Sequence, residues 1–271
     1  TSSRGLGDVY KRQALKLNRR DNDELLRVLS ETQWNFWRQN GYVVIKNAIS
    51  REQANDTASF LWEFEEKSPN KPKSWYHAPR AEMQMKELAG TGMVEVYNHQ
   101  HLWTNRQSQK VYDAFVDVWG TEKLWVTIDR ANLNFPIKKG FEYKGFIHWD
   151  YDPETKPENV QGVIALSDQI DPNMGGFQCI PWLYQNYDSW KTTQPENRNR
   201  FQPDIKDLED KIEKVSMHAG DLLIFNSLLA HGIRPNQSKE KVRIAQYISM
   251  MPAEEQNESL KEWRINSWQH R

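Results

Sequence analysis

The chain has 271 residues and a formal net charge of −1, with apolar residues at 38% and charged residues at 27%. This length and balance allow one large domain with a packed core. The near-zero charge gives no electrostatic reason to expect nucleic acid or an anionic membrane as a partner. The single cysteine excludes an internal disulfide framework and fits a reducing, cytoplasmic compartment. No apolar run approaches the roughly 20 residues needed to span a bilayer.

The first residues of the chain differ in character from the rest. Residues 1–13 read TSSRGLGDVYKRQ, which is similar to a translated adapter sequence. We therefore expect a non-native or disordered leader and leave it out of the fold. Residues 14–271 show no internal repeat and no linker, and we expect them to form a single domain.

The N-terminal part has helical spacing. Leucines and tryptophans recur at helical intervals in residues 23–39, and Gly41 is suited to end that helix in a left-handed conformation. Residues 42–45 form a short apolar run with β-branched side chains, which predicts a strand. A Ser or Thr followed three residues later by Gln opens two further expected helices, 50–67 and 104–120. These helices predict a helical layer formed by the N-terminal part of the chain.

From Leu124 the period of the apolar residues changes from about 3.6 to 2, which predicts strands. Several short strands with turn residues between them indicate a sandwich or barrel. The polar segment 183–214 is too long for a hairpin loop and is expected to be a lid or a surface insertion. The expected strands are 124–134, 143–150, 160–166, 176–180, 215–218, 222–225 and 242–250.

The segment GFIHWDYD places His148 and Asp150 two residues apart on an expected strand. Because side chains alternate along a strand, both point to one face and Trp149 to the other. An imidazole nitrogen beside a carboxylate oxygen suits a divalent transition metal. Alone, this pair is a weak signal, since a polar pair at a strand end is the commoner explanation.

Two later residues add to the pair. His231 follows the buried run LLIF in AGDLLIFNSLLAHG, and Arg243 opens the strand VRIAQYISM. Alternation puts Arg243 on one face with Ala245, which leaves room for a ligand, and a guanidinium holds a carboxylate with two hydrogen bonds. Taken singly, His231 fits a satisfied core histidine and Arg243 a structural ion pair.

Together, two histidines and one carboxylate make a facial triad that leaves three coordination positions open on Fe(II). A 2-oxo acid fills two of these positions and dioxygen the third. The distal carboxylate of that acid then needs a cation on a nearby strand, where Arg243 is expected. The sequence therefore predicts His148, Asp150 and His231 as the metal ligands and catalytic residues.

With these motifs in place, the chain resembles the phytanoyl-CoA dioxygenase family of Fe(II)/2-oxoglutarate oxygenases. The resemblance runs from about Trp34 to Pro252 and is specific at HWD (148–150), AGDLLIFNSLLAHG (219–232) and Arg243. It implies an α+β, mainly β fold with a double-stranded β-helix (jelly-roll, cupin-like) core. It also implies Fe(II), 2-oxoglutarate and dioxygen as cofactors, with Arg243 on the C5 carboxylate of 2-oxoglutarate.

We therefore expect a dioxygenase that hydroxylates a small organic molecule and releases succinate and CO2. The substrate itself stays open, because related enzymes act on varied molecules. Two alternatives also stay open. One is a jelly-roll protein that binds metal or ligand without turnover, and the other is a cupin-like metal enzyme that uses no 2-oxo acid.

Weaker candidates lie near the expected centre. Asn132, Asn134 and Gln161 are on neighbouring strands and are expected to donate hydrogen bonds to the co-substrate, although satisfied amides at a sheet edge explain them equally well. Asp152 shares the face of Asp150 and is a competing ligand that closer spacing disfavours. The pair His99 and His101 lacks a third ligand. Two tryptophans, at 149 and 182, fit core packing better than a pocket wall.

Overall fold

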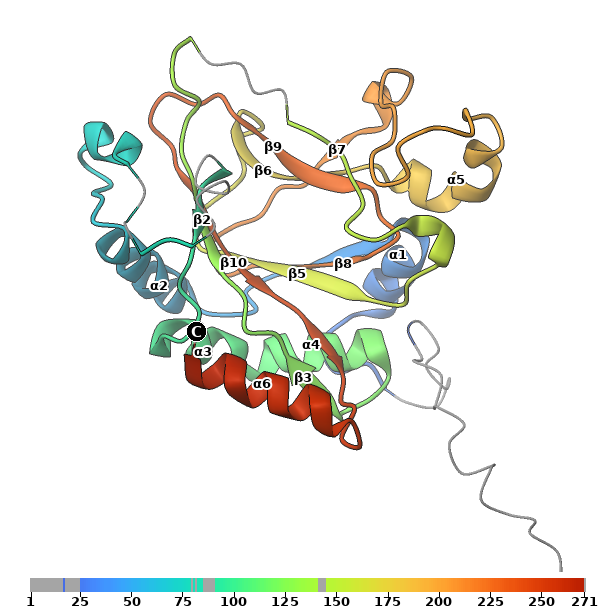
Figure 1. Ribbon diagram of the computed structural model, residues 1–271, viewed down its shortest axis with the longest axis horizontal. Helices are drawn as coiled ribbons and strands as arrows, with labels where there is room; N and C mark the ends of the chain where they lie inside the picture. Colours follow the sequence, from blue (N-terminus) through green and yellow to red (C-terminus); the bar gives the residue numbers. More distant parts are fainter. Residues whose placement is uncertain are drawn as a thin grey trace, which may run out of the picture.

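Two antiparallel sheets face each other in the computed structural model, which describes residues 17, 25–78, 80, 82–84, 91–140 and 145–270. Figure 1 shows the smaller sheet above the larger one. The larger sheet has the order β1-β8-β5-β10-β4-β2, made of Tyr42–Ile45, Leu222–Asn226, Val160–Ala165, Arg243–Ile248, Ala131–Asn134 and Met93–Val94. The smaller has the order β7-β6-β9, made of Glu213–Lys214, Met174–Cys179 and His231–Asn236.

Helices cover the outer side of the larger sheet, while one helix lies at the end of the smaller sheet. Figure 1 shows α3, α4 and α6 beneath the larger sheet, α2 at its left and α5 to the right of the smaller sheet. A separate pair joins β3 (Leu124–Val126) to β11 (Met250–Pro252). The α-helices are α1 (Glu31–Asn40), α2 (Arg51–Phe64), α3 (Gln100–Arg106), α4 (Gln109–Trp119), α5 (Pro181–Lys191) and α6 (Glu258–His270). Short 3-10 helices are η1 (Pro72–Tyr76), η3 (Pro153–Thr155) and η4 (Glu209–Lys211).

The helix boundaries follow from local capping chemistry. Ser50 and Gln53 form the predicted reciprocal capping box at the start of α2. Ser30 forms a second box, so α1 begins later than the predicted residue 23. Gly41 ends α1 with φ 73°, as predicted, because a glycine adopts the left-handed conformation without a Cβ clash. The predicted helix 104–120 is wrong at its start, since Thr104 lies inside α3 and α4 is a separate helix.

Strand alternation divides the core into two layers. On β8, Leu222 and Ile224 pack with the helices, in a cluster that includes the buried Trp37 and Trp119. Leu223 and Phe225 point the other way, between the sheets. The space between the sheets is filled by small and apolar residues: Val163, Ala165, Ala245, Phe177 and Cys179. Burial raises the pKa of the Cys179 thiol well above its usual value, so this thiol is inert.

Most of the predicted strands are present, with three differences. The predicted strand 124–134 is two strands, β3 and β4, which pair with different partners. Within 145–150, the described part of the predicted strand 143–150, the only regular pairing is one bridge at His148. The predicted strand 215–218 is reduced to a bridge from Met217 to Gln169. In each case a turn or loop interrupts a run that reads as continuous in sequence.

Two predictions about the chain as a whole can be compared only with the residues that the structure describes. The expected leader, residues 1–13, lies outside the described residues. Among the helices of the described ranges, none has the length and apolar character that crossing a membrane would need. The single domain expected for 14–271 remains a prediction.

A buried carboxylate on α4 supports the segment that leads into α1. Asp117 is 1% exposed and accepts hydrogen bonds from the backbone N–H groups of Arg27, Val28 and Leu29, each at 2.8 Å. Replacing it (Asp117→Ala) leaves these donors without an acceptor, so we expect a loss of about 2–4 kcal/mol in the free energy of unfolding. Asp113→Ala on the same helix removes a surface ion pair with Arg27 and should cost less than about 1 kcal/mol. Urea unfolding measures both, and equal losses would contradict this account.

Candidate metal centre

A two-residue bridge brings the HWD segment to the start of β9. His148 N donates to His231 O at 2.8 Å, and His231 N donates to His148 O at 3.0 Å. Residues that exchange both backbone hydrogen bonds are directly opposite each other, so their side chains lie on one face. Gly232 permits this approach, because a Cβ there would stand 1.9 Å from Phe146 O. Two histidines far apart in sequence thereby become neighbours.

The three predicted metal ligands form one cluster. His148 Nε2 lies 3.3 Å from Asp150 Oδ1, and His231 Nε2 lies 3.3 Å from Asp150 Oδ2. The ligand atoms of His148, Asp150 and His231 all fall within 4.8 Å of one another. Among the described residues this is the only group of three or more such side chains with metal-binding geometry. The burial is graded: the His231 side chain is 8% exposed and that of Asp150 is 39% exposed.

Local contacts favour the protonation states of His231 and Asp150 that metal binding needs. His231 Nδ1 lies 2.9 Å from Leu229 O, which favours a proton on Nδ1 and leaves the Nε2 lone pair free. Burial raises the pKa of Asp150, but its polar contacts with the His148 and His231 imidazoles and the Gln161 amide outweigh this effect and hold that pKa well below its usual value. The carboxylate is therefore ionised, and both imidazoles present Nε2 toward it.

The spacing fits a divalent ion. Ligand atoms about 2.1 Å from such an ion and at right angles to each other stand roughly 3 Å apart. The two observed nitrogen–oxygen distances of 3.3 Å agree with that spacing. Two imidazoles and one carboxylate are also the donor set that non-haem Fe(II) takes in a facial triad. The residues present thus fit the metal.

Aromatic rings surround the two histidines. The ring centroid of His231 is 4.4 Å from that of Phe225 and 5.7 Å from that of Phe177, both buried between the sheets. Phe146 lies on the other side, 4.7 Å from the His148 ring, and is 41% exposed. The inner side of the centre is lined by buried apolar rings, and the exposed Phe146 lies beside the outer histidine, His148.

Arg243 lies on the same interior face as the cluster of residues that contacts His231. It is fully buried at the start of β10, with Ala245 next on its face. Its observed partners are neutral: Asn132 Oδ1 at 2.8 Å, Tyr247 Oη at 3.3 Å and Gln169 Oε1 at 3.4 Å. Its Nη2 is buried with no hydrogen-bond partner among the described residues. A buried guanidinium in this state is suited to a carboxylate ligand.

The three predicted amide donors have different surroundings. Asn132 lies opposite Ala245 on β4, holds Arg243 and donates to Thr91 O at 2.8 Å. Asn134 lies opposite Arg243, and its Oδ1 is buried without a partner among the described residues. Gln161 contacts a predicted metal ligand, since its Nε2 donates to Asp150 Oδ2 at 2.6 Å. Their roles toward a co-substrate remain predictions.

Sequence reasoning gave no role to three interior residues. Tyr247 shares the face of Arg243 four residues away, so alternation alone could have identified it. Gln169 lies in a loop whose position no local pattern predicts. Arg234 on β9 is 2% exposed and donates to Phe177 O at 2.8 Å. Burial, and then the charge of Arg243, lower the pKa of Arg234 to about 10, so two cationic side chains lie near each other in the interior.

The polar segment 183–214 packs behind the HWD segment. Its first part is α5, and Trp190 and Leu208 join Trp149 in a buried cluster. Trp149 N donates to Phe201 O at 2.8 Å, and Trp149 Nε1 donates to Leu228 O at 3.0 Å. The residue between two predicted ligands is therefore held by the backbone of this segment.

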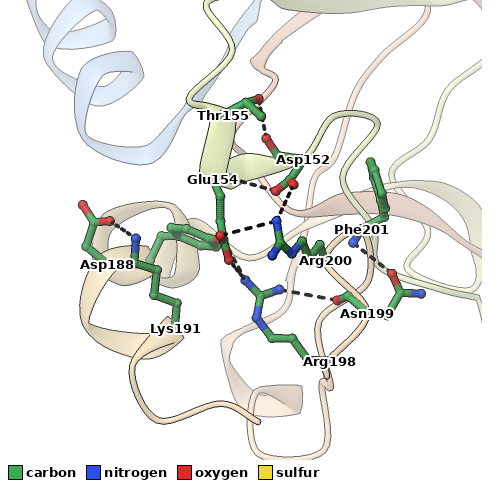
Figure 2. A network of polar contacts seen from close by, with 10 residues as sticks. Asp152, Glu154, Thr155, Asp188, Lys191, Arg198, Asn199, Arg200 and Phe201 are labelled. Atoms are coloured by element: carbon green, nitrogen blue, oxygen red, sulfur yellow. Dashed lines mark hydrogen bonds and ion pairs between the residues drawn. The ribbon is translucent and has the colours of Figure 1, made fainter. Parts of the chain in front are cut away.

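Two arginines fasten the segment to the residues after Asp150, as Figure 2 shows. Arg198 Nη2 lies 2.9 Å from Glu154 Oε1, and Arg200 Nη1 lies 3.4 Å from Asp152 Oδ2. Asp152 also caps η3, so it does not compete as a metal ligand in this arrangement. His99 and His101 are likewise outside the cluster, with His99 stacked on Phe60 at 3.5 Å between ring centroids.

The sequence profile of the family described as Phytanoyl-CoA dioxygenase (PhyH) matches residues 37–245 of the chain. The chain belongs to the phytanoyl-CoA dioxygenase family. This match confirms the family and the class of enzyme, a dioxygenase among the oxidoreductases, that the motifs predict. The cofactors implied by the resemblance, Fe(II), 2-oxoglutarate and dioxygen, are those of the family.

A relative and two solved structures extend the comparison. "Ava biosynthesis cluster protein O" of Aspergillus versicolor is 25% identical over 251 residues, which cover 85% of this chain and 80% of that protein. HygX of Streptomyces hygroscopicus, crystallised with nickel and 2-oxoglutarate, has a TM-score of 0.57 at 14% identity, covering 83% and 88% of the two chains. The epimerase SnoN, crystallised with Fe3+, alpha-ketoglutarate and nogalamycin RO, has a TM-score of 0.55 at 16% identity, covering 82% and 83%. The likeness to the two structures confirms the predicted jelly-roll fold.

The arginine contacts predict that the segment 183–214 supports the metal centre. Arg198→Met removes the ion pair to Glu154 and the hydrogen bond to Tyr187 Oη, so the HWD segment should lose part of its support. We expect Co(II) affinity to fall roughly 3- to 10-fold, the equivalent of about 1 kcal/mol. Isothermal titration calorimetry measures this change.

The same segment provides a matched control. Lys191 forms an exposed ion pair with Asp188 at 3.1 Å, which Figure 2 shows apart from the ion pairs of Arg198 and Arg200. Lys191→Met should leave Co(II) affinity unchanged, because an exposed pair contributes little. If the two variants change the affinity equally, the ion pairs do not support the metal site.

Proposed function

We propose that this protein is an Fe(II)- and 2-oxoglutarate-dependent oxygenase that hydroxylates a small organic molecule. His148, Asp150 and His231 would hold the iron, and Arg243 would bind the distal carboxylate of 2-oxoglutarate. The observation that carries the proposal is the buried Nη2 of Arg243, which lacks a partner among the described residues on the interior face that also contacts His231. A metal cluster alone does not explain why a buried cation is kept there without a carboxylate partner.

The residues suit this task in distinct ways. Asp150 remains ionised, so its negative charge offsets part of the charge of a divalent ion. Phe177 and Phe225 keep water from the inner side of His231. Asn132, Gln169 and Tyr247 hold the guanidinium of Arg243 in place for a carboxylate. When bound, Fe(II) with 2-oxoglutarate and dioxygen supplies the oxidation of a substrate C–H bond to an alcohol, with succinate and CO2 as the other products.

A small organic substrate has support from the surroundings of the metal cluster. Phe146 offers an exposed aromatic ring beside His148, which suits an apolar part of a small molecule. The relative from Aspergillus versicolor is named for a biosynthesis cluster, and SnoN was crystallised with the small molecule nogalamycin RO. We infer a small-molecule substrate for this chain as well.

The direct test is consumption of 2-oxoglutarate. Purified protein loaded with Fe(II) should form succinate in air, slowly without substrate and faster with a substrate from a broad panel of small molecules. Asp150→Ala should abolish succinate formation, because two imidazoles alone do not complete the triad. If the Fe(II)-loaded wild-type protein neither binds nor consumes 2-oxoglutarate, the proposal fails.

Arg243→Met tests the co-substrate site. Losing a charge-assisted hydrogen bond costs about 1.5–3 kcal/mol, so the Kd for 2-oxoglutarate should rise roughly 10- to 100-fold while metal affinity is unchanged. The exposed Arg38 on α1 gives the control, and Arg38→Ala should change neither quantity. Calorimetry on Ni(II)-loaded protein measures both affinities.

The outcomes also separate the alternatives. Unchanged 2-oxoglutarate affinity in Arg243→Met would favour a cupin-like enzyme that does not use this site. Binding of metal and 2-oxoglutarate with no succinate under any condition would favour a binding protein without turnover.

A further inference from the structure

Gln161 contacts the metal cluster through Asp150. It is the second residue of β5, pairs in register with Phe225 of β8 and is half-buried. Its Nε2 donates to Asp150 Oδ2 at 2.6 Å. The amide that sequence analysis assigns to 2-oxoglutarate thus lies on a predicted metal ligand, from the sheet opposite the HWD segment.

The hydrogen bond makes the two oxygens of Asp150 unequal. Oδ1 lies 3.3 Å from His148 Nε2, while Oδ2 accepts the hydrogen bond from Gln161 Nε2 and lies 3.3 Å from His231 Nε2. A carboxylate binds a metal through one oxygen or through both. A hydrogen bond from an amide to a charged oxygen is stronger than one between neutral groups, so it favours the binding mode in which Oδ2 stays with the amide. Oδ2 is the oxygen engaged by the amide, which leaves Oδ1 as the oxygen that would ligate a metal.

We propose that Gln161 is a positioning residue that keeps Asp150 bound to the metal through one oxygen only. Two imidazoles and one carboxylate oxygen leave three of six coordination positions open. A second carboxylate oxygen would fill one of them and leave two. Because 2-oxoglutarate and dioxygen together need three, Gln161 would preserve the position that dioxygen requires. The consequence for dioxygen rests on the proposed function, whereas the way in which Asp150 binds a metal can be tested without it.

The test counts water on the metal. In Mn(II)-loaded protein, water-proton relaxation reports the number of exchangeable water molecules bound to the ion. Wild type should hold roughly three and Gln161→Leu roughly two, because the second oxygen of Asp150 then replaces a water. The Kd of 2-oxoglutarate should rise roughly tenfold in the variant, the equivalent of about 1.4 kcal/mol. Gln161→Asn, whose amide is one methylene shorter, should behave like Gln161→Leu.

Gln185 supplies a matched control. It lies on α5 and donates to Asn40 Oδ1 at 3.2 Å on the exposed surface, so Gln185→Leu should match wild type in water count and in 2-oxoglutarate affinity. An unchanged water count in Gln161→Leu at saturating Mn(II) would overturn the inference. Loss of all Mn(II) binding in both Gln161 variants would also overturn it, because the amide would then be needed to form the site. If wild type binds Mn(II) but not 2-oxoglutarate, the proposed function fails while the water count still decides the role of Gln161.

Discussion

The centre of this protein depends on the backbone pairing of His148 with His231. Those two residues exchange both backbone hydrogen bonds, at 2.8 and 3.0 Å, and this bridge is the only regular pairing of the HWD segment within 145–150. The pairing places both imidazoles on one face, and strand alternation adds Asp150 to it. The absence of a side chain at Gly232 is what permits the two segments to come so close. The backbone pairing and the missing side chain of Gly232 therefore set the positions of the two imidazoles, and contacts between the imidazoles do not.

A segment held by one bridge needs support from behind, and the polar insertion provides it. Trp149 lies in a buried cluster with Trp190 and Leu208, and its backbone N–H is bonded to Phe201 O. Arg198 adds an ion pair to the loop after the ligands. The insertion therefore acts on the metal centre through packing and hydrogen bonds, and its polar composition reflects only the side that faces solvent.

The surroundings of His231 and of Arg243 in the interior differ in polarity. Aromatic rings from β6 and β8 pack on His231, whereas amide and hydroxyl oxygens surround the guanidinium of Arg243. A buried cation with only neutral partners is costly unless a ligand supplies the opposite charge. The arrangement therefore fits an anionic co-substrate that lies between the neutral side chains around Arg243 and the metal. Gln161 belongs to the metal side of this division, since its amide is engaged by Asp150.

The sequence by itself determined the candidate ligand set and the class of fold. Spacing of two on a strand placed His148 and Asp150 on one face, and apolar alternation in β8 and β10 predicted the sheets, because these patterns depend only on local backbone geometry. Only the tertiary structure decided which strands face each other, that Gln161 donates a hydrogen bond to Asp150, and that residues 183–214 pack against the HWD segment. Those contacts join residues distant in sequence, and a local pattern carries no information about the register or side chain of a distant partner. For that reason the candidate metal ligands could be read from the sequence, while the residues that position them could not.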